Sequence, residues 1–408
     1  MRKQRWLGAS AALVSLMLVL AACNGGGESA AESTAESVVE SIAESVAPSE
    51  APTGFAACGD QDAGTAFKIG GVTDVGQLED KSFNEAGWCG TLAGIDSVGG
   101  TGEVIVTEKT EDYAVNMQTL IDDGFQIIVT FGFAIGDATL VAAKANPEIN
   151  FIGLDQFYCI DANGVKDTSP TAAPDCEGNA TFDDILPNLQ GLVFAEAHAG
   201  YVAGVLACSI SETGVVGAVG GIFAIPPVPQ YIGGYHNGCL SVNPDAQVLV
   251  QYVSEDITKA FNDPTTGRQL AQQMLDLDAD VLFQVAGGSG QGVLEAACDA
   301  DVYGIGVDID QYLSSPNVAQ CIVTSAEKKI VLAIKSAIER VADGTAVGGN
   351  VTGDATNGGI GLAPYHDFED LITADIQAKI DAALEDLASG TVDPCAGPGI
   401  CFFDPDPS

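Results

Sequence analysis

The chain has 408 residues, of which 47% are hydrophobic and 7% are aromatic. Its 56 Asp and Glu residues outnumber its 15 Lys and Arg residues, which gives a formal net charge of −41. Such a surface repels nucleic acid and anionic ligands, and it accommodates a neutral or cationic small molecule more easily. The acidity is equally typical of adaptation to a salty habitat, so charge alone does not identify the ligand.

Residues 1–22 have the pattern of a secretory signal peptide, with three basic residues in the first five followed by an apolar run. The run is too short and wrongly flanked for a membrane span. It ends in the sequence LAAC, which resembles the lipobox of bacterial lipoproteins and implies cleavage before Cys23 and attachment of lipid (palmitate) to its sulfur. The alternative is an ordinary secreted protein with a chance cysteine. We therefore predict a protein anchored by lipid to the extracytoplasmic face of the cell membrane.

Residues 23–62 are predicted to be a disordered acidic tether. A Glu-Ser pair recurs every fourth residue until prolines interrupt the pattern at Pro48 and Pro52. Low hydrophobicity and charge of one sign do not support a packed core. Without the signal peptide, 12 basic residues face 56 acidic ones, a net charge of −44.

The remaining ~340 residues are enough for two domains. Apart from Cys23 the chain has ten cysteines, an even number that predicts disulfides in an exported protein. Cys395 and Cys401 bracket a short loop, and Cys159 and Cys176 bracket a polar insertion, so each pair is spaced to form a bridge. The sequence does not pair the other six, which are Cys58, Cys89, Cys208, Cys239, Cys298 and Cys321. A CxxC pair, typical of zinc or thiol-redox sites, does not occur.

Strand-like runs alternate with helical patterns from residue 67 onward. The first set has strands at 67–75, 102–108, 125–132 and 149–156, with helices at 82–95, 113–124 and 136–147. After the insertion at 157–184, a second set has helices at 195–210, around 230–241, 265–278 and 290–300, with strands at 214–221, 247–253, 279–287 and 302–308. This alternation predicts an α/β fold with two lobes, each a parallel sheet covered by helices. The ligand cleft of such sheets lies beyond the carboxyl ends of their strands.

The segment GGVTDVGQLEDKSFNEAGWCG, residues 70–90, concentrates polar groups and two aromatic residues at one such strand end. Glu79, Asp80, Lys81 and other hydrogen-bonding side chains surround the turn into the following helix. We predict that this turn forms one wall of a cleft that holds a ring-shaped polar ligand.

Seven segments, in order between about residues 66 and 390, resemble the basic membrane protein family. They are TDVGQLEDKSFNEAGW, NLQGLVFAEAHAGYVAGVLA, IPPVPQYIGGYHNG, FNDPTTGRQLAQQML, ADVLFQVAGGSGQGVLEAA, GIGVDIDQY and GGIGLAPYHD. Members are lipoproteins similar to purine nucleoside receptor A and serve as the binding components of ABC importers. The resemblance implies a type I periplasmic-binding-protein fold, in which two Rossmann-like lobes joined by a hinge hold the ligand in a central cleft. We expect 63–185 plus 309–345 in the N-terminal lobe and 186–308 plus 346–400 in the C-terminal lobe.

The resemblance implies that four residues contact the ligand, three of them at the nucleobase. Asp80 lies in the ligand-contacting turn, Trp88 matches an aromatic that faces the base, Asp155 matches a carboxylate that binds base nitrogens, and Tyr231 matches the second stacking aromatic. Taken singly, Trp88 and Tyr231 are more typical of core or rim packing. Asp155 taken singly is more typical of a helix N-cap.

Four further positions are implied at the ligand, the last three of them at the ribose. Gly287 or Gly288 lets backbone approach the ligand, Gly306 and Asp308 form a ribose-contacting turn, and Lys328 contacts the ribose and partly neutralises Asp308. The alternatives are a calcium loop formed by Asp308 and Asp310, although no EF-hand spacing follows, and a solvent-facing lysine on a helix at Lys328.

The chemistry of a purine nucleoside fits these residue types. Stacking on an aromatic face contributes about 1–3 kcal/mol per base in nucleic-acid binders. Hydrogen bonds to charged groups contribute about 1.5–3 kcal/mol, so carboxylates suit the donors of a base and a ribose.

Catalysis finds little support in the sequence. The three histidines are scattered, and neither HExxH nor GxSxG occurs. We predict a binding protein with no catalytic residues, no cofactor and no metal. Transport would require a separate ABC permease and an ATPase, since the sequence has no Walker A motif. The alternatives are a receptor for a sugar or other small molecule on the same fold, and a signalling or surface lipoprotein.

Overall fold

The computed structural model describes residues 54–160, 185–396 and 401. The predicted signal peptide, Cys23 and most of the tether lie outside the described residues, as does most of the 157–184 insertion. Residues 54–62, predicted as the end of the tether, begin with the 3₁₀ helix η1 (Gly54–Ala57), and Cys58 next to it is bonded to Cys89. Among the described residues, no helix is long and apolar enough to cross a membrane.

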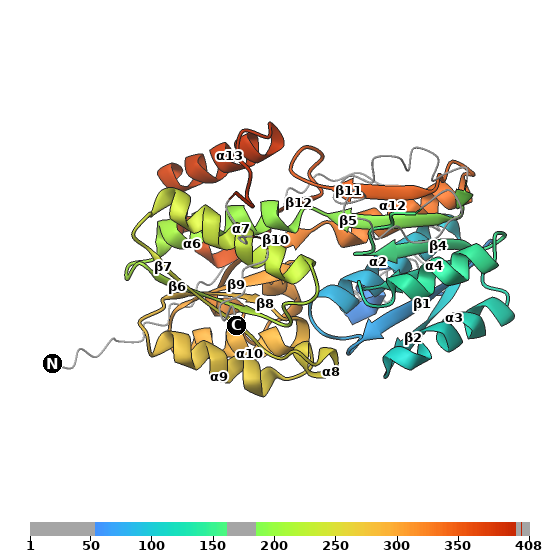
Figure 1. The fold of residues 1–408 in the computed structure, drawn as a ribbon, viewed down its shortest axis with the longest axis horizontal. Coiled ribbons are helices and arrows are strands. Elements are labelled where there is room, and N and C mark those ends of the chain that lie inside the picture. Colours follow the sequence, from blue (N-terminus) through green and yellow to red (C-terminus); the bar gives the residue numbers. More distant parts are fainter. Residues whose placement is uncertain (1–53, 161–184, 397–400, 402–408) are drawn as a thin grey trace, which may run out of the picture. The chain divides into compact units, whose positions relative to one another are not determined.

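The first lobe is built on a six-stranded parallel sheet with the order β11-β5-β4-β3-β1-β2. Its strands are β1 (Lys68–Val75), β2 (Thr101–Thr107), β3 (Ile127–Phe131), β4 (Asn150–Leu154), β5 (Leu189–Phe194) and β11 (Gly349–Gly353). Its helices are α2 (Phe83–Val98), α3 (Tyr113–Asp122), α4 (Gly136–Ala145) and α12 (Ile330–Ala342), with the 3₁₀ turn η2 (Thr110–Asp112). Figure 1 shows α12 beside α2.

The second lobe repeats this architecture with the strand order β12-β10-β9-β8-β6-β7. Its strands are β6 (Val215–Gly220), β7 (Gln247–Tyr252), β8 (Val281–Val285), β9 (Tyr303–Asp308), β10 (Ile322–Lys328) and the antiparallel β12 (Ile360–Leu362). Its helices are α6 (Glu196–Ile210), α7 (Pro227–Val242), α8 (Ile257–Ala260), α9 (Pro264–Leu275), α10 (Gly287–Asp299), α11 (Gln311–Ser314) and α13 (Ala374–Ala388), with η3 (Ala319–Cys321) and η4 (His366–Leu371). Figure 1 shows α6 and α7 on one face of this sheet and α9 and α10 on the other.

Helices on both faces explain why the inner strands are nearly continuous apolar runs. Every residue of β3 and β8 is buried, because neither face of either sheet reaches water there. Helix starts follow capping chemistry where the sequence offers it. The Asp263 carboxylate accepts a hydrogen bond from the Thr266 amide at the start of α9, and Pro264 occupies the first turn.

Within the described residues, the chain passes between the two sheets three times. The passages run from β5 to α6, from β10 to α12 and from β11 to β12, and together we call them the hinge. Backbone bonds join them, since the Ala195 amide donates to the Gly353 carbonyl and the Lys329 amide donates to the Gly359 carbonyl, each at 2.9 Å.

The hinge divides the chain differently from the predicted lobe boundaries. β5 and β11 pair in the first sheet, although 186–308 and 346–400 were expected in the C-terminal lobe. β10 pairs in the second sheet, although 309–345 was expected in the N-terminal lobe. The difference arises because each sheet is completed on one side by strands that lie next to a passage, and alternation of elements along the chain does not reveal that pairing.

Four disulfides fall within the described residues, and none of these four links the two lobes. They are Cys58–Cys89, Cys208–Cys239, Cys298–Cys321 and Cys395–Cys401, with Cα–Cα separations of 5.0–5.3 Å. The predicted Cys395–Cys401 bridge is confirmed. Cys176, the predicted partner of Cys159, lies outside the described residues. The four bridges cross-link each lobe internally.

Helices α6 and α7 pack through glycines. A Cβ atom at Gly204 would lie 2.0 Å from the Tyr235 carbonyl oxygen, and one at Gly238 would lie 1.9 Å from the Tyr201 carbonyl oxygen. Backbone therefore packs directly against backbone, and no rotamer change can make room for a side chain.

We predict that Gly204→Ala lowers the free energy of unfolding by about 2–3 kcal/mol, because the added methyl forces the two helices apart. Gly361→Ala is the matched control, since a Cβ atom there meets nothing within 4 Å. Urea denaturation followed by circular dichroism measures both variants. Equal stability of the two would contradict the proposed close packing.

Candidate functional site

A cavity lies where the carboxyl ends of the strands in the two sheets face each other. Its empty space amounts to about 690 Å³, which includes the part that opens to solvent. Its polar lining includes Asp74, Asp80, Asn84, Asp155, Asp308 and Lys328, and its aromatic lining consists of Phe83, Phe133, Tyr231 and Phe261. Both lobes contribute to each group.

Lys328 is the central charge of the cavity. Its ammonium lies 2.5 Å from Asp155 Oδ2, 3.2 Å from Glu196 Oε1 and 3.7 Å from Asp308 Oδ1, and its side chain is 2% exposed. Asp155 follows β4 in the first lobe, Asp308 ends β9 in the second, and both Glu196 and Lys328 lie at the hinge. One ammonium group therefore connects both lobes and two hinge passages.

Burial dominates the ionisation of this cluster. Desolvation raises the pKa values of Asp155 and Asp308, although Lys328 opposes the rise. Desolvation also raises the pKa of Glu196 to about 7. Burial by itself lowers the pKa of Lys328, but the three carboxylates together raise that pKa above its ordinary value. The lysine stays charged, and the surplus of acceptors favours a ligand that donates hydrogen bonds.

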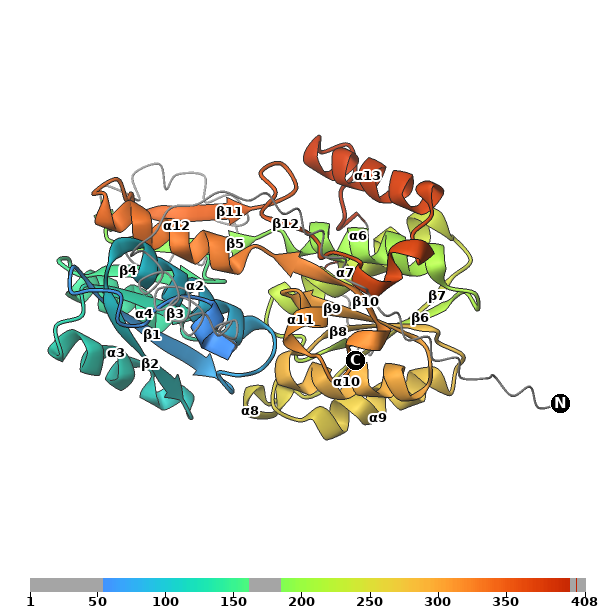
Figure 2. The same cartoon turned by 180° about the vertical axis from the view of Figure 1, so that it is seen from behind.

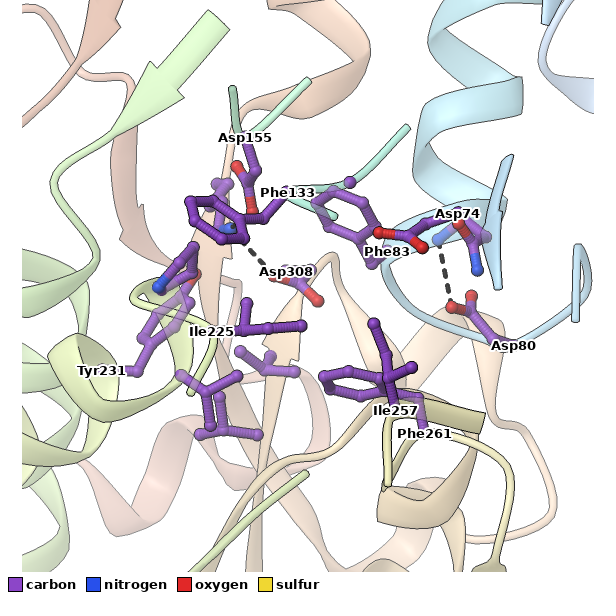
Figure 3. A pocket seen from close by; sticks show the side chains of 18 of the residues that line it. Asp74, Asp80, Phe83, Phe133, Asp155, Ile225, Tyr231, Ile257, Phe261 and Asp308 are labelled. Atoms are coloured by element: carbon purple, nitrogen blue, oxygen red, sulfur yellow. Dashed lines mark hydrogen bonds and ion pairs between the residues drawn. The ribbon is translucent and has the colours of Figure 1, made fainter. Parts of the chain in front are cut away.

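Asp155 and Asp308 occupy matching places in the two lobes. Each follows or ends a buried strand, and each has a left-handed backbone, with φ of 56° and 67°. This conformation is uncommon outside glycine and is best tolerated by Asp and Asn. It directs both carboxylates into the cavity, where Figure 3 shows Asp308 between Asp155 and Asp80.

The predicted pair of stacking rings is not formed by Trp88 and Tyr231. Trp88 is 3% exposed and packs in the core of the first lobe, away from the cavity. Phe83 lines the cavity instead, and a residue five positions later on the same helix points about 140° away from it. Tyr231 lines the cavity, but it is 1% exposed and its hydroxyl donates to the Ala326 carbonyl at 3.2 Å. Its ring is part of the wall.

Gly306 also lies elsewhere than predicted. A Cβ atom at this position would be 2.6 Å from Gln311 Oε1 and 2.4 Å from Ser325 Oγ, so the glycine makes room for protein groups inside the second lobe. Gly287, with φ of 49°, does line the cavity, and a Cβ atom there would lie 3.8 Å from Asp80 Oδ2.

Asp80 lines the cavity and also organises its own turn. Its oxygens accept from the backbone amides of Ser82, Asn84 and Glu85 at 2.9, 3.0 and 3.2 Å. Burial nevertheless raises the pKa of Asp80 to about 7. The crowded turn of residues 70–90 thus forms a cavity wall, as predicted, but much of its polarity is used to hold the backbone in place.

The structure also contradicts the alternative roles of Asp155, Asp308 and Lys328, which were a helix N-cap, a calcium loop and a solvent-facing lysine. Asp155 is followed by non-helical residues, and its carboxylate meets Lys328. Asp310, the second carboxylate of the calcium-loop alternative, lies 2.7 Å from His366 Nε2. Among the described residues no group of His, Cys, Asp or Glu has the arrangement of a metal site. Lys328 ends strand β10 and is buried.

Several residues of the site were missed in the sequence. Phe83, Phe133 and Phe261 carry ring faces, and Asp74 binds Tyr113 and the amide of Ala134. Glu196 lies in α6, a helix of mostly small residues, and an isolated carboxylate in such a helix was the sequence feature that could have indicated it.

Two acceptors in the cavity lining have no partner. Asp155 Oδ1 and Asn84 Oδ1 are buried and make no hydrogen bond within the protein. An unpaired buried acceptor is costly unless a donor reaches it, so both atoms are suited to a ligand with N–H or O–H groups.

Two sheets with matching strand orders, a hinge of three passages and a cavity between the lobes are typical of a solute-binding protein of type I fold. The chain belongs to the PnrA-like family of ABC transporter substrate-binding proteins, whose model matches residues 67–389. The predicted family and fold are thereby confirmed. The family binds substrates and is not enzymatic, as predicted.

Two related proteins match this chain at 29% sequence identity. The ABC transporter nucleoside-binding protein BmpA of Lactococcus lactis subsp. cremoris is 29% identical over 367 residues, covering 83% of this chain and 93% of that protein. Basic membrane protein A of Borreliella burgdorferi is 29% identical over 261 residues, covering 62% of this chain and 66% of that protein.

Solved structures show the same fold. An ABC transporter solute-binding protein from Aeropyrum pernix K1 superposes with a TM-score of 0.67 at 20% identity, covering 80% of this chain and 92% of that one. Another, from Conexibacter woesei DSM 14684, has a TM-score of 0.61 at 24% identity, covering 83% of this chain and all of that one.

We predict that Lys328→Met lowers the free energy of unfolding by about 3–5 kcal/mol at pH 8, because it leaves buried carboxylates without their cation. The loss should be smaller at pH 5. Below its pKa of about 7, Glu196 holds a proton in the folded state and no longer needs the lysine.

Lys335→Met is the control, since Lys335 pairs with Glu339 on an exposed helix face and should change stability by less than about 0.5 kcal/mol. Urea unfolding at both pH values measures the effect. A loss for Lys328→Met that does not depend on pH would contradict the electrostatic role.

Proposed function

We propose that this substrate-binding protein takes a purine nucleoside in the interlobe cavity and delivers it to an ABC permease. The observation that carries the proposal is a buried acceptor, Asp155 Oδ1, that lacks a donor in a cavity lined by aromatic rings. A purine presents a flat face and ring or exocyclic N–H donors, and its ribose adds a hydroxyl pair.

Phe83 and Phe261 are the rings best placed to hold the base. Phe83 comes from the first lobe and Phe261 from the second, and Figure 3 shows them on opposite sides of the cavity with Asp308 between. The base would stack between lobes, so closure of the hinge would complete the site.

The polar groups divide naturally between base and sugar. Asp155 offers its free oxygen to a base N–H, while Asp308 and Lys328 offer an acceptor and a donor to the ribose hydroxyls. Similarity to the nucleoside-binding BmpA of L. lactis supports a nucleoside as the ligand. The neutral ligand would also avoid the electrostatic penalty that the acidic chain imposes on nucleotides.

Thermal melting and calorimetry with inosine, guanosine and adenosine test the proposal. We expect stabilisation by at least one of them and none by free ribose. Asp308→Asn should weaken binding about 10- to 100-fold, because it removes a charged acceptor. Asp310→Asn is the control, since its carboxylate faces His366, and it should change affinity by less than about twofold.

Stabilisation by sugars alone would favour a sugar receptor. Absence of stabilisation by all these compounds would favour a signalling or surface role, and either result would overturn the nucleoside assignment.

Membrane attachment through Cys23 is a separate proposal, supported by the LAAC sequence before the acidic tether. Lipidation would keep the binding lobes near the permease. We expect Cys23→Ser to move the protein from the membrane fraction to the soluble fraction, and mass spectrometry of the wild-type N-terminus should find an acylated cysteine. A wild-type chain that is soluble and unmodified after export would contradict the anchor.

A further inference from the structure

Hydrogen bonds join the lobes at the turn that precedes α2. The Lys81 carbonyl accepts from Gln311 Nε2 and from Ser314 Oγ, each at 2.9 Å, and Ser82 Oγ donates to Asp308 Oδ2 at 2.8 Å. Lys81 and Ser82 belong to the first lobe, while the other three residues belong to the second. Figure 2 shows α11, which carries Gln311 and Ser314, beside this turn.

The first-lobe side of this contact is held rigidly. Lys81 has a left-handed backbone, with φ of 62°, which turns its carbonyl toward the second lobe. Asp80 fixes the following residues by accepting from the amides of Ser82, Asn84 and Glu85. A non-glycine residue keeps such a conformation only where its surroundings impose it.

The second-lobe side is equally fixed. Gln311 is fully buried, and its Oε1 accepts from the Val307 amide at 3.0 Å and from Gln284 Nε2 at 2.5 Å. The backbone amide of Gln311 donates to Ser325 Oγ at 3.0 Å. The side-chain oxygen is thus used inside the second lobe, and the side-chain nitrogen is left to point across the gap.

We propose that Gln311 and Ser314 are positioning residues that hold the Lys81 carbonyl and thereby set how long the closed lobes retain the ligand. We call these two hydrogen bonds to the Lys81 carbonyl the clasp. By fixing Lys81, the clasp fixes Ser82 against Asp308, a residue of the ligand site. The ligand part of this inference rests on the proposed nucleoside function.

The clasp complements the hinge in the geometry of the site. Asp308 Oδ1 faces Lys328 at the hinge, whereas Asp308 Oδ2 faces Ser82 next to the clasp. Opening the lobes breaks the clasp but leaves the covalent hinge intact. The clasp therefore contributes to the closed state alone, and its loss should speed ligand release and leave association unchanged.

Ser314, the last residue of α11, and Ser315, which follows it, provide a matched pair of variants. Ser314 Oγ crosses to the first lobe, whereas Ser315 Oγ donates to Gln291 Oε1 at 3.0 Å within the second lobe. Ser314→Ala and Ser315→Ala each remove one hydroxyl, one residue apart. Gln311→Glu keeps an oxygen for Val307 and Gln284 but replaces the donor to Lys81 with an acceptor.

Stopped-flow release of inosine from the full chain measures the ligand effect. Ser314→Ala should raise the dissociation rate constant about two- to tenfold, with the association rate constant unchanged, and Gln311→Glu should raise it further. Ser315→Ala should leave both rate constants within about twofold of wild type. Equal dissociation rates for Ser314→Ala and Ser315→Ala would overturn the proposal.

Hydrogen–deuterium exchange without ligand tests the clasp independently of the nucleoside assignment. Peptides covering 77–88 should exchange faster in Ser314→Ala than in wild type. In Ser315→Ala their exchange rate should equal that of wild type. If wild type binds no nucleoside but this exchange difference appears, the proposed function fails and the clasp stands. If wild type binds inosine but neither release nor exchange differs between the two serine variants, the clasp fails and the function stands.

Discussion

The structure depends on one buried ammonium group, that of Lys328, among three carboxylates. Asp155, Glu196 and Asp308 come from the first lobe, the hinge and the second lobe, and no two of them are neighbours in sequence. Without Lys328, three buried carboxylates gathered around one point would repel one another and would each lack a counter-ion. Lys328 makes their approach possible and still leaves the site with more acceptors than donors. That imbalance is what suits the cavity to a neutral, donor-rich ligand.

Hinge and clasp divide the control of closure between them. The hinge supplies three backbone passages, and none of the four described disulfides links the two lobes. The clasp adds two hydrogen bonds that exist only when the lobes meet. A receptor must bind firmly and also release its ligand to a permease. Weak, geometrically exact contacts between rigid partners satisfy both needs better than a large apolar interface would.

Prediction from sequence succeeded where a signal repeats along the chain. Strand β1 was expected at 67–75 and occurs at Lys68–Val75, where every residue after Lys68 is buried. Prediction failed where one segment offered two aromatic side chains for the same place in the cavity. Trp88 is the larger ring, but Phe83 lies at the first turn of α2, on the face toward the cavity. Glu196 was not predicted as a site residue, because its partner Lys328 is distant in sequence.

The sequence by itself determined the α/β alternation, the family and most of the polar residues of the cavity, since these follow from local periodicity and from short segments in order. Only the tertiary structure decided which strands complete each sheet, which rings reach the cavity and which polar groups are already paired. Those outcomes depend on contacts between segments more than a hundred residues apart, such as Lys328 with Asp155 and Gln311 with Lys81. Local sequence carries no record of such distances, because the energy of each contact arises only when the lobes have folded and met.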